Sequence, residues 1–441
     1  MEDSITKTVL IEIIQPSKET VNLTTPITLT PLQLSKIINQ NNVSFFVNSQ
    51  KITKNLSFHV KSFEKKVTIN VLKDEEMIVP ASFFNKSYDG HSGAVLGISY
   101  NISKKLYSVG GDNCLVEWDT KMRCKKTIHK EHSHWVQCVD SITDGEKTVV
   151  ATGSMDSAVN VFVSGKSCNL KKSISIKIHK KPLTSVNFAS SSLLLTTSRD
   201  MTVSLLDLDL EGQKYTIKSS YTHNSQVLGG YLCKNNKFFF SFCKGKRILI
   251  YEIDKVNKKL IFRQEIKIGV DITTLFITDD NSSLFVGCDD GTLYFYNISK
   301  GKTIFENNEK EFSPFFFKKK IEISKDSISA IKQFNNIFLA ISSFNGRVFS
   351  LNIESLFKKE IYKHASPVLC LESVSKSGNI IMTGCMSGYV RVFEFGADKV
   401  VSEFHTEGAV YCLKSYQGIE NGNKKVEVVA GGADGKLYFF S

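Results

Sequence analysis

Histidines and aspartates that recur along the chain are the residues whose types and spacing could do chemistry. His129, His132 and His134 lie close together in HKEHSH and could suggest a metal site. A structural role is the stronger interpretation, because histidine recurs at the same place in a repeat described below. Turn-like sequences contain further acidic residues, which we expect to hold those turns: Asp112, Asp156, Asp200, Asp290 and Asp434. There is no P-loop, GxSxG or HExxH motif, so we predict that the chain is not an enzyme.

One acidic residue stands apart from this pattern. Glu64 lies in KSFEKKVTINV, next to Lys65 and just before a predicted strand. An exposed carboxylate in such a loop can supply an oxygen ligand to a hard cation such as Mg²⁺. The cation would be held by another protein that leaves one coordination position open, so no cofactor of the chain's own is expected. The alternative interpretation is an ordinary surface glutamate among lysines.

The stretch from Gly90 to Asp119 contains the repeated unit. Three short apolar runs are separated by turn residues, which is typical of antiparallel strands. The opening Gly-His and closing Trp-Asp indicate a WD-type unit, one blade of a β-propeller. Within it, His91, Ser108, Asp112 and Trp118 could form a hydrogen-bonded chain that satisfies buried polar groups. Only this copy keeps the whole signature; in later copies the tryptophan position holds Phe162, Leu206, Tyr251, Tyr296, Leu351, Phe393 and Phe440.

The unit recurs eight times, which predicts eight blades. The later copies begin near His132, His179, His223, Asp271, Ser327, His364 and His405. The last copy stops at Ser441, after its third strand, and would leave an unpaired edge. We predict that Met77 to Lys86 supplies the missing outer strand. An insertion at about 300–320 carries FSPFFFKKK, whose Phe315 to Phe317 form either an outer strand or a docking point for RNA or protein.

The first 78 or so residues have a different pattern. Strands are expected at 7–14, 21–24, 43–48, 51–53 and 67–72. Thr30-Pro31 is a helix start with proline at the first position. The next apolar residues, Leu32, Leu34, Ile37 and Ile38, predict a helix with one buried stripe. The order β-β-α-β-β is that of a ubiquitin-like domain. The predicted fold is therefore a small α+β ubiquitin-like domain (1–78) followed by an all-β, eight-bladed WD-repeat propeller (79–441).

Composition and charge indicate what kind of cellular compartment and what kind of binding partner to expect. The chain has 441 residues and a net charge of +12, carried by scattered lysines. This charge favours acidic partners such as RNA or acidic proteins, although a plain solvated basic surface explains it as well. Ten cysteines occur without a CxxC pair, which fits a reducing compartment and gives no support for a zinc site. No secretory signal or apolar stretch of transmembrane length is visible, so no membrane association is expected.

The chain resembles the Notchless family of WD-repeat factors for assembly of the large ribosomal subunit. The similar segments are LTPLQLSKIINQ, FEKKVTINV, HSHWVQCVDSITDGEKTVVATGSMD and the closing VVAGGADGKLYFFS. The resemblance implies that the N-terminal domain binds the metal-site domain of midasin, an AAA+ ATPase, and that Glu64 completes a Mg²⁺ shell in trans. It also implies that the propeller grips pre-60S ribosomal proteins and rRNA while the ATPase pulls. The chain would then be a monomer within a large particle in the nucleolus and nucleus.

Two alternatives to this interpretation remain. One is the related large-subunit factor that pairs the same N-terminal domain with a seven-bladed ring and works beside the Pescadillo and Bop partners. The other is a WD-repeat scaffold or substrate receptor of a ubiquitin ligase. The number of blades separates the first alternative from an eight-bladed assembly factor, and the loop glutamate and basic charge argue against the second.

Overall fold

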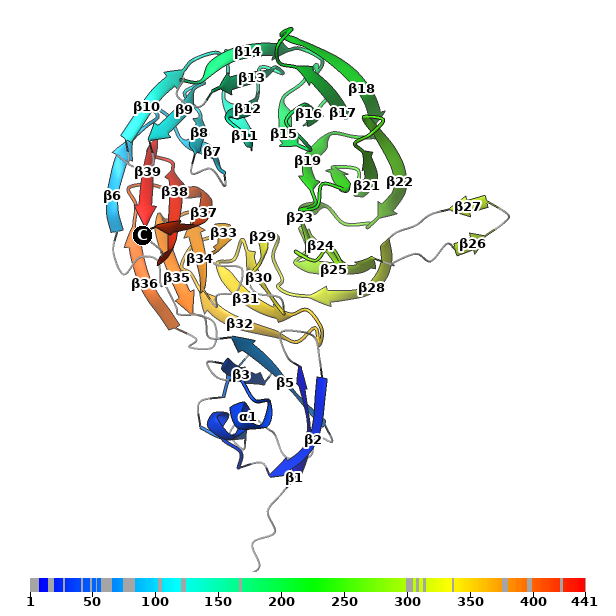
Figure 1. Cartoon of the computed structure of the whole chain (residues 1–441), viewed down its shortest axis with the longest axis vertical. Helices are drawn as coiled ribbons and strands as arrows, with labels where there is room; N and C mark the ends of the chain where they lie inside the picture. Colours follow the sequence, from blue (N-terminus) through cyan, green and yellow to red (C-terminus); the bar gives the residue numbers. More distant parts are fainter. Residues whose placement is uncertain are drawn as a thin grey trace, which may run out of the picture.

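The computed structural model describes residues 8–14, 20–26, 28–40, 43–47, 50–52, 54–56, 66–73, 84–101, 105–119, 124–165, 169–298, 304–306, 309–311, 315–334, 337–374, 380–394, 399–420 and 423–440. They form a ring of sheets around a central opening and a smaller N-terminal unit beside it (Figure 1). In this part of the chain no helix is both long and apolar enough to cross a membrane.

The ring consists of eight four-stranded antiparallel sheets among the described residues, so the predicted eight blades are present. Blade 1 contains β7 (Val95–Tyr100), β8 (Leu106–Gly110), β9 (Leu115–Asp119) and β10 (Cys124–His129). Blade 2 contains β11 (Val136–Asp144), β12 (Lys147–Ser154), β13 (Val159–Ser164) and β14 (Lys171–Ile176). Blade 3 contains β15 (Leu183–Phe188), β16 (Leu193–Ser198), β17 (Thr202–Asp209) and β18 (Lys214–Thr222). Blade 4 contains β19 (Val227–Leu232), β20 (Phe238–Cys243), β21 (Arg247–Asp254) and β22 (Lys259–Lys267).

The second half of the ring repeats this arrangement. Blade 5 contains β23 (Ile272–Ile277), β24 (Ser283–Cys288), β25 (Thr292–Ile298) and β28 (Phe315–Glu322). Blade 6 contains β29 (Ile328–Gln333), β30 (Phe338–Ser343), β31 (Arg347–Asn352) and β32 (Lys358–Lys363). Blade 7 contains β33 (Val368–Ser373), β34 (Ile380–Cys385), β35 (Tyr389–Glu394) and β36 (Lys399–His405). Blade 8 contains β37 (Val410–Glu420), β38 (Asn423–Gly432), β39 (Lys436–Phe440) and, from the start of the ring, β6 (Phe84–Asp89).

The second strand of most blades is buried along its whole length. In β16, β24, β30 and β34 all six residues are buried. Both faces of such a strand are covered by neighbouring blades, which explains why the sequence reads as a continuous apolar run rather than an alternating one. The core therefore lies between blades: Trp118 of blade 1, for example, packs with Val429 and Phe439 of blade 8. Each blade is stabilised by contact with its neighbours.

The ring is closed by pairing between its first and last strands. β6 is antiparallel to β39, with Asp89 opposite Lys436 and Phe84 opposite Phe440. The strand predicted at 77–86 thus overlaps the observed one only at 84–86, and residues 77–83 lie outside the described residues. The domain limits predicted at 78 and 79 also fall in this undescribed segment and stay predictions.

The N-terminal unit is a five-stranded sheet with one short helix. Its sheet order is β2-β1-β5-β3-β4, formed by β1 (Thr8–Ile14), β2 (Thr20–Pro26), β3 (Val43–Val47), β4 (Gln50–Lys51) and β5 (Lys66–Lys73). β1 and β5 are parallel and central, and the other pairs are antiparallel. Helix α1 (Pro31–Ile37) starts where predicted, with the Thr30 N–H donating to Gln33 Oε1 at 2.9 Å.

The predicted buried stripe of α1 is partly wrong. Leu34 and Ile38 are buried, but Leu32 is 69% exposed and Ile37 is 42% exposed. The helix has only seven residues, so four apolar positions span more of its circumference than the sheet covers. Two residues at i and i+4 suffice to dock it onto the core formed by Ile11, Ile69 and their neighbours.

Two further expectations concern the ring. Phe315 to Phe317 begin β28, the outer strand of blade 5, so the outer-strand interpretation is confirmed. The insertion before it contains a small hairpin of β26 (Ile304–Glu306) and β27 (Glu309–Glu311), visible as a projection in Figure 1. The prediction that His405 opens the eighth copy is wrong. His405 ends β36 of blade 7, and Thr406 takes the loop position that histidine occupies in other blades. The eight cysteines whose side chains are described are free thiols.

Candidate binding face at one end of the propeller

One backbone hydrogen bond recurs in all eight blades and builds a common face. The residue after the second strand donates its N–H to the carbonyl of the residue before the first strand, at 2.8 to 2.9 Å. The donors are Gly111, Met155, Arg199, Lys244, Asp289, Phe344, Met386 and Ala433, and the acceptors are Ala94, Trp135, Pro182, Gln226, Asp271, Ser327, Pro367 and Ala409. We call these sixteen positions the loop ring.

Contacts between blades place all of these loops at the same end of the molecule. A Cβ on Gly291, Gly346, Gly388 or Gly435 would lie within 2.8 Å of a carbonyl oxygen in the loop that leads into the next blade. All four have positive φ, between 75° and 86°, which side chains other than glycine adopt at a cost. In blades 5 to 8, each turn is therefore pressed against the loop that leads into the next blade.

A series of hydrogen bonds supports the loop ring in blade 1. It joins the four residues that the sequence predicts to be connected. Trp118 Nε1–H donates to Ser108 Oγ at 2.8 Å. Ser108 Oγ lies 2.8 Å from His91 Nε2, and His91 Nδ1 lies 2.8 Å from Asp112 Oδ1. Because the ionised Asp112 can only accept, the proton of the neutral His91 ring lies on Nδ1, so Nε2 accepts the hydroxyl proton of Ser108. Every polar group in this series is satisfied.

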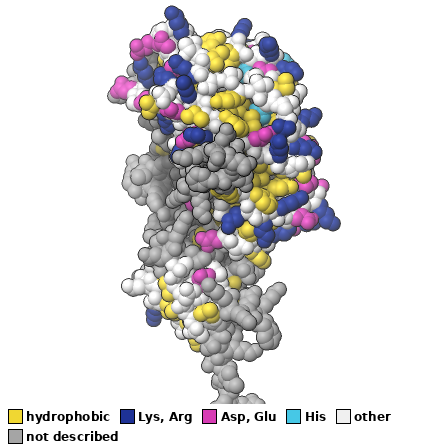
Figure 2. Space-filling model, turned by 90° about the vertical axis from the view of Figure 1, so that its right-hand side faces the viewer, with side chains coloured by type: hydrophobic (Ala, Val, Ile, Leu, Met, Phe, Trp, Pro, Cys, Tyr) yellow, Lys and Arg dark blue, Asp and Glu magenta, His cyan; other side chains and the backbone are white. Residues whose placement is uncertain are grey.

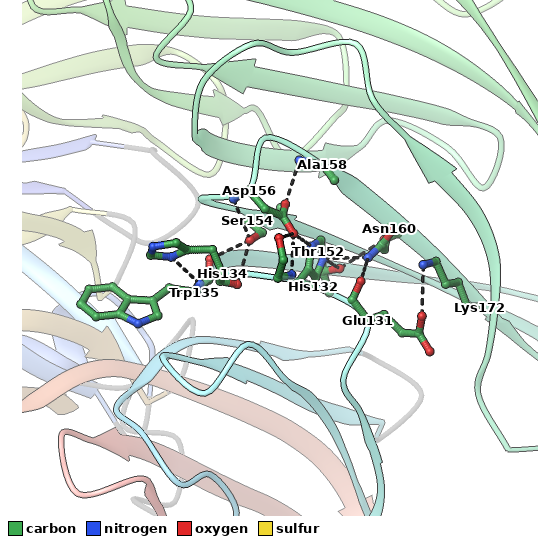
Figure 3. A network of polar contacts seen from close by, with 12 residues as sticks. Glu131, His132, His134, Trp135, Thr152, Ser154, Asp156, Ala158, Asn160 and Lys172 are labelled. Carbon is green, nitrogen blue, oxygen red and sulfur yellow. Dashed lines mark hydrogen bonds and ion pairs between the residues drawn. The ribbon is translucent and has the colours of Figure 1, made fainter.

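Blade 2 keeps this arrangement without the tryptophan (Figure 3). His132 Nδ1 lies 3.0 Å from Asp156 Oδ2, and His132 Nε2 lies 2.9 Å from Thr152 Oγ1. Asn160 Nδ2 also donates to Nε2, at 3.2 Å, so Nε2 is an acceptor and the imidazole proton lies on Nδ1. Asp156 further accepts the Ala158 N–H at 2.9 Å, which holds the turn as predicted.

The histidine–threonine–aspartate triad of blade 2 recurs in blade 3, whereas blades 4 and 7 lack the aspartate. His179 contacts Thr196 and Asp200 at 2.9 and 3.1 Å. In blade 7, Arg391 approaches His364 Nδ1 at 2.6 Å. This contact makes Nδ1 the acceptor and reverses the tautomer, so that Nε2–H faces Thr383.

In blade 4 the aspartate position is occupied by Gly245, and His223 contacts only Ser241, at 2.7 Å. Polar networks therefore extend well beyond the first copy.

Four histidines of these networks, His132, His179, His223 and His364, have lowered pKa values and are neutral at physiological pH. Burial lowers the pKa of His132 and of His179, and the neighbouring aspartates raise it by less. Burial lowers the pKa of His223 to about 4, and burial together with Arg391 lowers that of His364 to about 4. Burial alone would raise the pKa of Asp112, but hydrogen bonds from His91 and two backbone N–H groups hold it below its ordinary value. The carboxylates are ionised and fully occupied within the fold.

The turn role predicted for the five aspartates is confirmed by their contacts. In each turn an Oδ1 atom accepts the N–H two residues later, at 2.9 to 3.2 Å. The donors are Cys114, Ala158, Thr202, Thr292 and Lys436. Each turn positions the loop-ring residue that directly precedes its aspartate.

The three clustered histidines are separated in the structure. His129 ends β10 and its ring packs against Phe162, with 5.4 Å between ring centroids. His132 is buried in the blade 2 network, whereas His134 is exposed next to Trp135. Within the described ranges no group of three or more His, Cys, Asp or Glu side chains is arranged to hold a metal ion. Glu64 and Lys65 lie outside the described residues, directly before β5.

Sequence reasoning missed the networks of blades 2 and 3 and the arginine of blade 7. A usable signal was present, because His132, Thr152 and Asp156 are spaced almost as His91, Ser108 and Asp112 are. Tryptophan is too strict a marker of the network, because Trp118 donates a single hydrogen bond to Ser108 and does not contact the histidine through it. The histidine and its aspartate can pair without the tryptophan, as in blade 2. Arg391 replaces an aspartate from a different strand, β35, and carries no comparable signal.

Comparison with known proteins identifies similar chains. A family model described as "WD domain, G-beta repeat" matches residues 122–162, and one described as "LRRK2 beta propeller" matches residues 340–441. A ribosome biogenesis protein WDR12 homolog from Drosophila yakuba is 28% identical over 139 residues, which is 29% of this chain and 32% of that protein. The match thus spans about a third of the relative's length.

Solved structures of Sqt1 are similar in fold. Saccharomyces cerevisiae Sqt1 has a TM-score of 0.69 at 12% identity, covering 81% of this chain and 98% of that one. Chaetomium thermophilum Sqt1, solved bound to the N-terminus of ribosomal protein L10, has a TM-score of 0.65 at 14% identity, covering 80% and 98%. At such low identity these likenesses show the fold alone, a WD-repeat propeller.

Proposed function

We propose that this chain is a non-enzymatic assembly factor of the large ribosomal subunit, whose propeller docks on the pre-ribosomal particle. The similarity to a protein described as a ribosome biogenesis factor supports this role. A structural neighbour that was solved with a segment of a ribosomal protein supports a binding rather than a chemical use of such a propeller. rRNA and pre-60S ribosomal proteins are the proposed partners, in the nucleolus and nucleus.

The loop ring is the observation that carries the docking part of the proposal. Beneath it, histidines, serines, threonines and aspartates of blades 1 to 3 hydrogen-bond one another inside the blades and hold the backbone of the face in place. Several of its outward side chains are exposed, including Trp135 and Met386 at 50% and 58%. A rigid scaffold that presents variable side chains is suited to recognition by surface complementarity.

We further propose that the N-terminal unit is ubiquitin-like and binds the metal-site domain of a midasin-type AAA+ ATPase. The central parallel pair β1 and β5, the flanking hairpins and the single helix support this assignment. Glu64 lies directly before β5 and would donate an oxygen ligand to a Mg²⁺ ion held by the ATPase, with Lys65 beside it. ATP hydrolysis would then belong to the partner.

Sedimentation tests the ribosomal role. The tagged chain should co-sediment with 60S precursors on a sucrose gradient of nuclear extract and move to the top of the gradient after RNase treatment. A chain that sediments free of ribosomal precursors under all conditions refutes the assembly role. Co-purification with cullin-type ligase subunits instead would favour the ubiquitin-ligase receptor. The eight four-stranded sheets argue against the seven-bladed Pescadillo–Bop factor.

A pull-down with the isolated midasin metal-site domain tests the second part. Wild type should bind in Mg²⁺ and lose binding in EDTA, and Glu64→Ala should reduce binding even in Mg²⁺. Lys65→Ala examines the neighbouring lysine, and Glu146→Ala, in the exposed β11–β12 turn of the propeller, is the matched control. Equal binding by wild type and Glu64→Ala, with and without EDTA, would exclude the coordination.

A further inference from the structure

Apolar side chains stand exposed around a large part of the loop ring. Trp135 of blade 2, Phe344 of blade 6 and Met386 of blade 7 are 50%, 46% and 58% exposed. Tyr411, which lies next to the loop ring at the start of β37, is 43% exposed. Trp, Tyr, Phe and Met are the residues enriched in the centres of protein–protein interfaces. Four of them on one face are more than scattered exposure of single residues explains.

The indole of Trp135 is held in place and has a free donor. The Trp135 carbonyl accepts from Met155 N–H and from Ser154 Oγ, both at 2.9 Å, which anchors its backbone to the turn of blade 2. The ring points away from the β11–β14 sheet (Figure 3) and reaches Gly111 of blade 1. Within the described residues the Nε1–H donates to no acceptor, and Nε1 lies 3.8 Å from the position that a Cβ on Gly111 would take.

Basic side chains occupy the adjoining sector of the same face. Arg199 and Lys244 are loop-ring residues of blades 3 and 4, and Lys180 and Lys181 lie in the loop that leads into blade 3. All four side chains are exposed, and in the part of the chain that the structure describes their charged ends have no ion pair or hydrogen bond. On the side of the molecule that Figure 2 shows, Lys and Arg are interleaved with acidic and apolar side chains.

The nearest carboxylates do not neutralise this sector. Asp156 and Asp200, in the turns of blades 2 and 3, are each bound to a histidine and to backbone N–H groups. Exposed acids appear on the loop ring only at blade 5, as Asp271 and Asp289 among the described residues. A ligand that crosses blades 2 to 4 therefore meets unpaired positive charge next to an exposed indole.

We propose that the loop ring binds an acidic protein segment that carries apolar side chains. Arg199 would pair with a carboxylate, with Lys180, Lys181 and Lys244 adding long-range attraction, and Trp135 would pack against an apolar side chain of the segment. Arginine suits carboxylate binding because its planar fork makes two parallel hydrogen bonds. The inference rests on this face alone and holds whether or not the chain acts on ribosomes.

A protein segment fits this face better than RNA does. Single-stranded RNA could stack bases on Trp135 and Phe344, but its phosphates are repelled by Asp271 and Asp289, and the thioether of Met386 offers a base no aromatic surface. A polypeptide can place acidic residues over blades 3 and 4 and apolar residues over blades 2, 7 and 6. RNA is therefore the competing outcome of the test rather than part of the proposal.

A peptide array with the full-length chain tests the inference. Random 12-residue peptides lacking tryptophan are probed, and the strongest binders are titrated in solution. The chain has only two tryptophans, and Trp118 is buried, so a change in indole emission on binding reports on Trp135. A 12-nucleotide single-stranded uridine RNA is titrated in parallel at 50 and 200 mM salt.

The expected binders are enriched in Asp and Glu together with Phe, Leu or Ile, and they change the emission of Trp135. Trp135→Ala and Arg199→Ala should each weaken binding about tenfold, and Arg199→Lys should be intermediate. Lys255→Ala and Val256→Ala, exposed changes in the β21–β22 turn at the opposite end, are the matched controls and should bind as wild type. Binders rich in lysine, no effect of Trp135→Ala and Arg199→Ala, or tighter binding of the RNA would each overturn the proposal.

Discussion

Stability should fall as pH drops from 7.5 to 5.0, because two buried histidines resist protonation. His223 and His364 are 4% and 2% exposed, and their pKa values are about 4. Gly245 stands where other blades carry aspartate, so no aspartate contacts His223, and burial lowers its pKa more than the charge of Glu265 raises it. His364 faces the positive charge of Arg391. Both folded environments disfavour the imidazolium form.

The sign and size follow from proton linkage. An unfolded histidine titrates near 6.5, so between pH 6.5 and 4 the unfolded chain binds protons that the folded chain does not. The stability that depends on these two neutral histidines is therefore fully present above pH 6.5 and is lost as the pH falls from 6.5 towards 4. With a folded pKa of about 4, each histidine lowers the free energy of unfolding by about 2 kcal/mol at pH 5.0. The two together lower it by about 4 kcal/mol.

Guanidinium unfolding at pH 7.5 and 5.0, on wild type and on His223→Gln, measures this effect. The variant has no imidazole to titrate at this position, so its difference between the two pH values should be about 2 kcal/mol smaller than that of wild type. Thr216→Ala, at an exposed position of β18, changes no titratable group and should leave the difference unchanged. An undiminished pH dependence in His223→Gln would refute the argument that burial keeps this imidazole neutral.

Three further substitutions or truncations examine other parts of the ring. Trp118→Phe removes the hydrogen bond to Ser108 but keeps an aromatic ring in place, and should lower the free energy of unfolding by about 1 kcal/mol in urea titrations; no change would mean that the indole N–H contributes nothing. Gly435→Ala places a methyl group 2.3 Å from the His91 carbonyl at φ +79°, and should cost about 2 kcal/mol or more, whereas Gly165→Ala, with no atom within 4 Å, should cost about 0.5 kcal/mol or less. A chain of residues 90–441 lacks β6 and should form oligomers through the open edge of β39, while a chain of residues 84–441 should be monomeric by light scattering; monomers in both cases would show that the closing strand is dispensable.

The blades were predictable because all of them carry one local signal and five of them carry a second, independent one. Alternating or continuous apolar runs mark the strands, and an aspartate marks the turn between the second and third strands. Both are properties of neighbouring residues, so they survive the loss of the tryptophan in seven blades. The exposed loop-ring residues, such as Trp135 and Arg199, follow no pattern of their own and become visible only when the eightfold hydrogen bond aligns them.

The errors came from features decided by distant parts of the chain. MIVPASFFNK is predicted as the closing strand because it lies just before the first copy of the repeat, whereas β6 is the more polar FNKSYD. An outer strand keeps one face in water, and its Tyr88 packs on Phe439 from the other end of the chain. His405 was taken as a loop histidine, although pairing with Tyr389 keeps it in β36. A shift of one residue reverses the face of every side chain, and local sequence does not reveal it.

Closure of the ring by β6 also sets a condition on its synthesis. β6 is made before any other strand of the ring and its partner β39 is made last, roughly 350 residues later. At ~5–20 residues per second a ribosome needs about 20–70 s to cover that distance. Until β39 leaves the exit tunnel, β6 has no strand to pair with and its backbone hydrogen-bonding groups stay exposed. The nascent chain therefore needs protection from pairing with strands of other proteins during that interval.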